Sequence, residues 1–172
     1  MRLLHRLGIT ALVSAIEDAG LIIWLAMLHT SPALSVALAA AVTLFTFLSV
    51  EHLISQRDSA GKLTKRSILQ VLGFTALEVV NWAVWLALTA ISPLAAVSYF
   101  ATSFYAEHQI TYNVKKGRPF LKFSGGSIGE DVLAETASEL TGSVLWLALP
   151  PPFNIIALVT GSSVEHFIAS GQ

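Results

Sequence analysis

The chain has 172 residues, of which 54% are hydrophobic and only 12% are charged. A soluble domain carries about 25% charged residues, so this composition predicts a surface that faces lipid rather than water. The formal net charge of −1 gives no indication of nucleic acid as a partner, and the lack of cysteine excludes disulfides, thiolate metal sites and thiol nucleophiles. At this length we expect a single transmembrane domain, residues 1–172.

Six apolar stretches follow one another along the chain, each roughly the 20 residues that a helix needs to cross the hydrocarbon core. Helices are expected rather than strands, because an isolated strand in lipid would leave its backbone groups unpaired. Short uncharged turns with prolines join the stretches in pairs, and longer polar linkers, about 56–67 and 113–129, join the pairs to one another. The predicted spans are about 7–28, 33–55, 68–91, 93–112, 130–149 and 151–169.

All ten Lys and Arg residues lie on one side of this layout, before the first span and in the two linkers. The positive-inside rule therefore predicts a multi-pass protein of the cell membrane with both termini and both linkers in the cytoplasm. The first apolar run, which follows Arg2 and Arg6, could also be read as a signal peptide. Glu17 and Asp18 lie inside that run and argue against this reading.

A repeat with a period of 61 residues runs through the odd-numbered spans. Each of these spans carries Ser or Thr, then Glu three residues later, and then Trp-Leu-Ala beginning seven residues after the Glu. The even-numbered spans all end in a Glu-His pair. Self-similarity at a fixed period is the signature of a repeated structural unit. The recurring residues are Ser14, Thr75 and Thr136; Glu17, Glu78 and Glu139; Trp24, Trp85 and Trp146; and the pairs Glu51-His52, Glu107-His108 and Glu165-His166.

Each repeat is a hairpin that crosses the membrane and returns, so successive copies keep the same orientation. The sequence predicts an all-α integral membrane fold of six transmembrane helices, arranged as three parallel helical-hairpin repeats around a pseudo-three-fold axis. The repeats cover about 7–55, 68–112 and 130–169. This arrangement differs from the inverted repeats found in many secondary transporters.

The hairpins bring the acidic positions to one depth in the cytoplasmic half of the membrane. At ~1.5 Å per residue, the Glu residues of the second and third repeats lie roughly 17–20 Å from the outer turns. Glu51 is several residues further from Pro32, which a longer outer turn or an extra half-turn would absorb. A charge at the bilayer centre costs ~2.5–3.5 kcal/mol, and no Lys or Arg lies within the spans to balance six acids. These acids must be protonated, hydrated or balanced by cations.

Bound metal explains this composition best, because carboxylate and imidazole without thiolate suit divalent ions such as iron, manganese and zinc. We expect a buried site with two or three ions, iron above all, with zinc or manganese as alternatives. Neighbouring residues on a helix point about 100° apart, so a His would bind one ion while the adjacent Glu bridges to the next. The predicted metal ligands are Glu17, Glu51, His52, Glu78, Glu107, His108, Glu139, Glu165 and His166.

In residue types, this ligand set resembles that of the ferritin-like di-iron carboxylate proteins, which combine lone Glu residues with Glu-x-x-His motifs. It departs from that set in spacing, in the number of copies and in its membrane setting. We expect Ser14, Thr75 and Thr136, one turn before each lone Glu, to hydrogen-bond to its carboxylate. Glu135, one turn before Glu139, is expected to approach the cluster.

These residues predict a membrane metal-dependent oxidoreductase, with iron redox or oxygen chemistry on a lipophilic substrate and no catalytic residue assigned. Metal-assisted hydrolysis is a second version of the same class. The alternative class is a divalent metal or proton-coupled transporter, against which the parallel repeats and the apolar outer stretches 21–28 and 83–88 weigh. Metal storage, a structural metal, and protonated carboxylates bonded between helices stay open. The expected partners are the lipid bilayer and a lipophilic small molecule, without nucleic acid.

Overall fold

A computed structural model describes residues 2–31, 33–115 and 127–169, and every regular element within these ranges is an α-helix. The helices are α1 (Arg2–Thr30), α2 (Leu34–Ala60), α3 (Lys65–Thr89), α4 (Pro93–Lys115), α5 (Ser127–Ala148) and α6 (Phe153–Ala169). The all-helical prediction is thus confirmed, and each predicted span coincides with one helix. The two agree to within two residues at the end that adjoins a short proline turn. The basic residues Lys116, Arg118 and Lys122 of the second linker lie outside the described residues.

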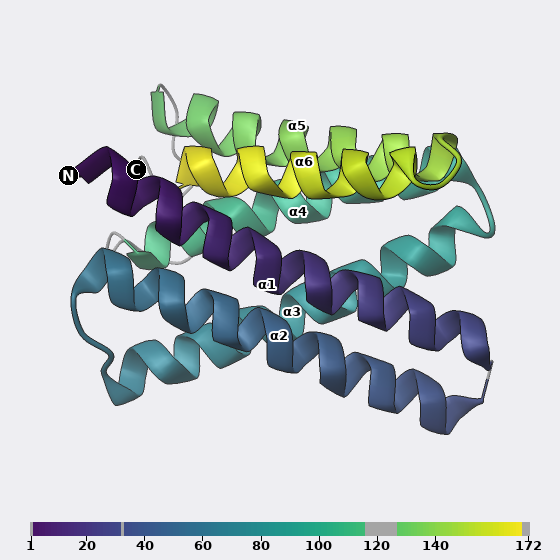
Figure 1. The fold of residues 1–172 in the computed structure, drawn as a ribbon, viewed down its shortest axis with the longest axis horizontal. Helices are drawn as coiled ribbons and strands as arrows, with labels where there is room; N and C mark the ends of the chain where they lie inside the picture. The colour runs from purple at the N-terminus through teal and green to yellow at the C-terminus, as the bar shows by residue number, and fades with distance from the viewer. Residues whose placement is uncertain (1, 32, 116–126, 170–172) are drawn as a thin grey trace.

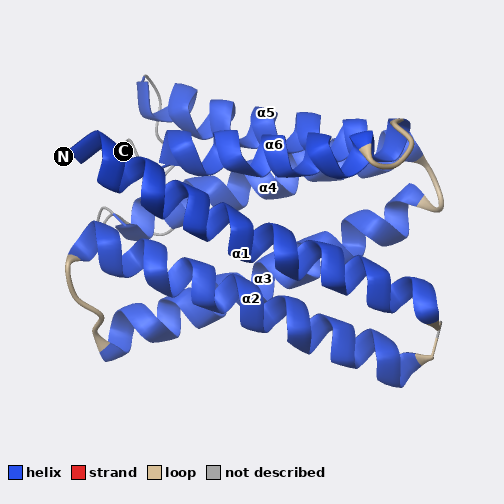
Figure 2. Ribbon diagram, viewed as in Figure 1, coloured by secondary structure: helices blue, strands red, loops and turns tan. Residues whose placement is uncertain are grey.

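Helices that follow one another in the chain pack side by side, and α6 returns to pack against α1. The turns that follow α1, α3 and α5 lie at one end of the bundle, which we call the turn end (Figure 1). The start of α1, the end of α6 and the connection from α2 to α3 lie at the opposite end, the linker end (Figures 1 and 2). The basic residues Arg57, Lys62, Lys65 and Arg66 therefore gather at the linker end.

The connection between α2 and α3 contains both a stop and a start signal. Gly61 ends α2 in the left-handed conformation, with φ 71°, which glycine adopts without a steric penalty. Thr64 then caps α3, because its side chain accepts a hydrogen bond from the Ser67 backbone while the Ser67 hydroxyl bonds to the Thr64 backbone nitrogen. This short linker fixes where the two helices meet at the linker end.

The outer surface of the bundle is apolar on every helix, whereas the interior contains buried acids. Exposed examples, one from each helix in order, are Leu12, Leu38, Leu69, Leu94, Leu133 and Ile156. The lone Glu of each repeat, by contrast, is at most 8% exposed. A water-soluble bundle, by contrast, keeps its polar and charged residues on the outer face.

Three helical stretches are long and apolar enough to cross a membrane, namely Leu3–Thr30, Leu34–Asp58 and Lys65–Thr89. The apolar stretch of α6, Phe153–Ile168, is shorter. Within the described residues, length and composition thus support three of the six predicted spans. The reason lies in the second half of the chain, where α5 carries additional acids in its first three turns and α4 is rich in Ser, Thr and Tyr. The added acids of α5 are Glu130, Asp131 and Glu135.

The half of the bundle nearer the turn end is filled by a buried apolar core. Four of its members form an aromatic core, Trp82, Trp85, Phe100 and Phe104, each at most 2% exposed. Trp82 contacts the other three rings edge to face, with centroid distances of 5.4, 5.8 and 5.2 Å. Phe100 stacks on Phe104 with their centroids 3.9 Å apart. Such contacts between rings leave little space for water along this half of the bundle.

Candidate metal centre

All nine predicted ligands line one cavity, which we call the metal cavity. Its volume is about 50 Å³, enough for a few water-sized particles, since a single water needs roughly 10–15 Å³ by this measure. All six helices contribute to the lining. Besides the predicted ligands, the lining contains Ser55, Phe104, Thr111, Tyr112 and Glu135. The repeat pattern therefore identified residues that the fold brings together.

Each histidine of a Glu-His pair reaches the lone Glu of the following repeat. The contacts run from α2 to α3, from α4 to α5, and from α6 back to α1, so they form a closed cycle. The distances between histidine Nε2 and glutamate Oε2 are 3.5 Å for His52 and Glu78, 3.4 Å for His108 and Glu139, and 2.6 Å for His166 and Glu17.

The ring of His52 is held by a threonine of the next helix. Its Nδ1 lies 3.1 Å from Thr75 Oγ1, and the Thr75 hydroxyl lies 3.0 Å from the Val71 carbonyl oxygen. Because a hydroxyl has one proton, and Thr75 donates it to the carbonyl, we assign the proton between His52 and Thr75 to Nδ1. The lone pair of the neutral imidazole is then on Nε2, which faces the carboxylates of Glu51 and Glu78.

The second repeat has the same arrangement. His108 Nδ1 lies 2.9 Å from Thr136 Oγ1, and that hydroxyl donates to the Val132 carbonyl at 2.9 Å. Thr75 and Thr136 therefore contact histidines, whereas we expected them to bond to the lone Glu of their own helix. The reason is that residues three apart share a face of the helix, and the imidazole of the preceding helix lies against that face.

The Nε2 atoms of His52 and His108 face carboxylate oxygens at distances that hydrogen bonds rarely have. Glu78 Oε2 and Glu139 Oε2 are buried and have no hydrogen-bond partner among the described residues. Their separations from Nε2, 3.5 and 3.4 Å, exceed the usual upper limit of about 3.2 Å. Two ligand atoms at ~2.1 Å from a tetrahedral ion are about 3.4 Å apart. The spacing thus matches two ligands of one cation.

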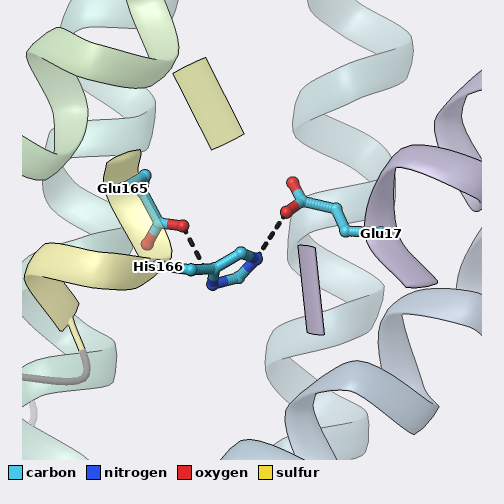
Figure 3. A group of neighbouring side chains, drawn as sticks. All are labelled: Glu17, Glu165 and His166. Carbon is cyan, nitrogen blue, oxygen red and sulfur yellow. Dashed lines mark hydrogen bonds and ion pairs between the residues drawn. The ribbon is translucent and has the colours of Figure 1, made fainter. Parts of the chain in front are cut away.

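The third repeat is bonded differently (Figure 3). His166 lies between two carboxylates, with Nε2 2.6 Å from Glu17 Oε2 and Nδ1 3.1 Å from Glu165 Oε2. Ser162 also donates to Glu17 Oε2, at 2.7 Å. Ser14, the counterpart of the two threonines, is buried, and its hydroxyl has no hydrogen-bond partner within the described part of the chain. The His166 imidazole therefore contacts two carboxylates, whereas the other two imidazoles each contact a threonine hydroxyl.

Glu165 belongs to two groups of side chains that could each hold an ion. The first group joins it to Glu17 and His166, and the second joins it to His108 and Glu135. Ligand atoms within each group lie within 4.8 Å of one another. A carboxylate shared in this way can bridge two ions, as we expected for the Glu of a Glu-His pair. Its position four residues before Glu139, one helical turn away, predicted that Glu135 approaches the cluster, and Glu135 does line the metal cavity.

Asymmetric polar residues surround Glu107. The Asn81 side-chain amide donates to Glu107 Oε2 at 2.5 Å, and the Tyr99 hydroxyl donates to Asn81 Oδ1 at 2.8 Å. Asn81 breaks the repeat, because the equivalent positions are Gly20 and Gly142, whereas no feature of the sequence pointed to Tyr99. Asp18, which follows Glu17 in the sequence, is also buried, at 5% exposed, but does not line the metal cavity.

No family model, curated protein or solved structure matches this chain. Its function is therefore inferred from the residues and their geometry. The described lining of the metal cavity contains seven glutamates and three histidines and has no Lys or Arg. Such a set of side chains can bind cations, because carboxylates and neutral imidazoles are electron-pair donors.

Proposed function

We propose that this chain is an integral membrane metalloprotein whose metal cavity holds two or three divalent ions. The observation that carries the proposal is the repeated geometry at His52 and His108. In both cases a threonine hydroxyl engages Nδ1, and Nε2 faces an unpartnered buried carboxylate oxygen of the next helix at 3.4–3.5 Å. Two electron-pair donors face each other there, and a cation bound between them satisfies both.

The charge of the cavity supports the same proposal. A charged side chain deep in a bilayer costs ~2.5–3.5 kcal/mol, and seven charged glutamates in a cavity whose described lining has no Lys or Arg would be prohibitive. Three divalent cations would balance six of these charges. Protonated carboxylates are the competing explanation, but a carboxylic acid that donates to Nε2 would be expected within about 3.2 Å. His166 and Glu17 meet that criterion, at 2.6 Å, whereas the other two pairs do not.

The proposed architecture has six membrane-spanning helices in three parallel hairpin repeats, related by a pseudo-three-fold axis along the membrane normal. Support comes from the cycle of contacts between each histidine and the next lone Glu, and from the packing of α6 on α1. The exposed Leu, Ile and Val side chains on all six helices support a lipid environment. Both ends of the chain and the α2–α3 connection would lie in the cytoplasm, where the basic residues are favoured.

We further propose that the ions are iron and that the centre carries out redox or oxygen chemistry on a lipophilic substrate. Carboxylate and imidazole ligands suit redox-active iron and manganese as well as zinc. A cavity of about 50 Å³ has room for water-sized molecules such as dioxygen beside ions, but none for a lipid. The lipophilic substrate would therefore meet the centre from outside the cavity. Transport across the membrane is the alternative, and the buried aromatic core between cavity and turn end weighs against it.

Elemental analysis of protein purified without chelator tests the proposal, together with the ultraviolet-visible spectrum. We expect at least two metal ions per chain and absorption from iron, and we expect His52→Ala and His108→Ala to lower the metal content. His29→Ala is the control, because His29 is exposed at the turn end. A protein that holds no metal, even after anaerobic addition of Fe²⁺ to chelator-treated protein, would leave protonated carboxylates as the explanation. Uptake of metal into sealed vesicles would instead support transport.

A further inference from the structure

A second, smaller cavity adjoins the metal cavity on the side of the linker end. We call this cavity the vestibule, and its lining combines polar and apolar side chains: His52, Ser55, Gln56, Ser67, Gln70, Val71, Phe74 and Thr111. His52, Ser55 and Thr111 line the metal cavity as well, so the two cavities share these three residues in their walls. The other members come from the last turns of α2 and the first turns of α3, which meet at the linker end (Figure 1).

The opposite side of the metal cavity is closed by the aromatic core. Phe104 lines the cavity itself, and Phe100 stacks directly on it. Trp82 contacts both rings, and all three side chains are at most 2% exposed. A hydrated ion could pass this layer only by losing its water among rings that offer no oxygen ligand. The two sides of the metal cavity therefore differ in what they allow to pass.

We infer that divalent metal ions enter and leave the metal cavity from the linker end, through the vestibule between α2, α3 and α4. This inference rests on the proposed function, since it requires that the cavity binds metal. The Ser, Thr and Gln side chains of the vestibule each have an oxygen that can bind a cation, and more weakly than a carboxylate does, while Val71 and Phe74 add apolar wall. The glutamates behind them attract cations inward. With a volume of about 20 Å³, the vestibule has room for a single ion or water molecule and none for larger solutes.

The basic residues of the linker do not block this route. Lys65 and Arg66 precede the vestibule residues on α3, but both are exposed. Charges in water are screened beyond about 8 Å at physiological ionic strength. The glutamates, by contrast, are buried, where screening by salt is weak, so their attraction on a cation inside the vestibule exceeds the repulsion by the exposed basic groups.

A pair of neighbouring substitutions on α3 tests the route. Gln70→Trp fills the vestibule but adds nothing to the metal cavity, whereas Leu69→Trp adds the same side chain at a position that is 70% exposed. Chelator-treated full-length protein is mixed with Co²⁺, and binding is followed by the visible absorbance of the bound ion. We expect Gln70→Trp to load about tenfold more slowly than unaltered protein but to the same final amount. Leu69→Trp should load at the unaltered rate.

Equal loading rates for the two Trp variants would overturn the inferred route while leaving the proposed function in place. If unaltered protein binds no Co²⁺ at any time, the proposed function fails, and the two results are thus distinguishable. In case Gln70→Trp does not fold, the natural lack of cysteine allows a second test. Gln70→Cys should react with a small cationic thiol reagent and then load slowly, while Ser143→Cys, at a fully buried position, should stay unreactive. Failure of Gln70→Cys to react, or fast loading after modification, contradicts the route.

Discussion

His166 of α6 lies 2.6 Å from Glu17 of α1, so the last helix contacts the first inside the metal cavity. A second contact joins the same two helices near the linker end, where Arg6 donates to the Phe167 carbonyl oxygen and lies over the Phe167 ring. Residues from opposite ends of the sequence thus hold the first and last helices together. The cavity needs this closure, because Glu17 comes from α1 and Glu165 and His166 come from α6.

The threonines that hold the imidazoles should control metal affinity. Thr75→Val keeps the shape of the side chain but removes the hydroxyl that accepts from His52 Nδ1. We expect metal affinity to fall roughly 10–100-fold, which is typical when a residue that orients a histidine ligand is changed. Thr75→Ser retains the hydroxyl and should stay close to the unaltered protein. Competition titration against a metal indicator measures the difference, and equal affinities for the Val and Ser variants would refute this role.

Glu78→Gln should change the metal-free and metal-bound protein in opposite directions. In the metal-free protein the new amide can donate to His52 Nε2, whereas Glu78 Oε2 has no hydrogen-bond partner among the described residues. Satisfying that buried group should raise the free energy of unfolding by roughly 1–3 kcal/mol. With metal present, the variant should lose stabilisation because the amide is a weaker ligand than the carboxylate. Thermal melts with and without metal test both signs.

Glu139→Gln provides the matched variant in the next repeat, since Glu139 Oε2 is also buried without a partner in the described ranges. Glu17→Gln is the contrast, because Glu17 already accepts from Ser162 and contacts His166. It should destabilise the metal-free protein. If all three variants destabilise the metal-free protein alike, the unpartnered oxygens are not the prepared ligands that we propose.

The sequence predicted the helices and the nine residues that share one cavity, because both follow from a pattern with one period. Length and apolarity define the spans, and the repetition of Glu and Glu-His selects the residues that must share an environment. The sequence could not predict which neighbour each hydroxyl contacts. Whether Thr75 reaches Glu78 or His52 depends on the rotation of α3 against α2, and many side chains set that rotation. The different bonding of His166 could not be predicted for the same reason, although the helix that it contacts has Ser14 where the other two repeats have Thr.

The crossing of α5 and α6 should be sensitive to the smallest added side chain. A Cβ on Gly142 would lie 2.9 Å from the Ala157 carbonyl oxygen, and one on Gly161 would lie 2.8 Å from that of Ser138. Since the obstacle is backbone, relief requires the helices to separate, which would also displace Glu139 and Glu165. We expect Gly142→Ala and Gly161→Ala to lower both the melting temperature and the metal content.

Gly73→Ala is the control for the two glycine substitutions. A Cβ at Gly73 meets nothing within 4 Å among the described atoms, and the position lies within α3. Alanine is favoured over glycine in a helix by up to about 1 kcal/mol, so this variant should be as stable as the original or more stable. If Gly142→Ala behaves like Gly73→Ala in the melts, the two helices are not in close contact in solution.

The orientation in the membrane can be tested with single cysteines, because the natural chain has none to interfere. Ile91 lies in the turn between α3 and α4 and is 79% exposed, and Lys62 is exposed in the connection between α2 and α3. The positive-inside rule puts the basic connection in the cytoplasm and the turn outside. A thiol reagent that cannot cross membranes should therefore label Ile91→Cys in intact cells and label Lys62→Cys only after the cells are opened. Labelling of Lys62→Cys in intact cells would reverse the proposed orientation, and with it the side from which metal reaches the cavity.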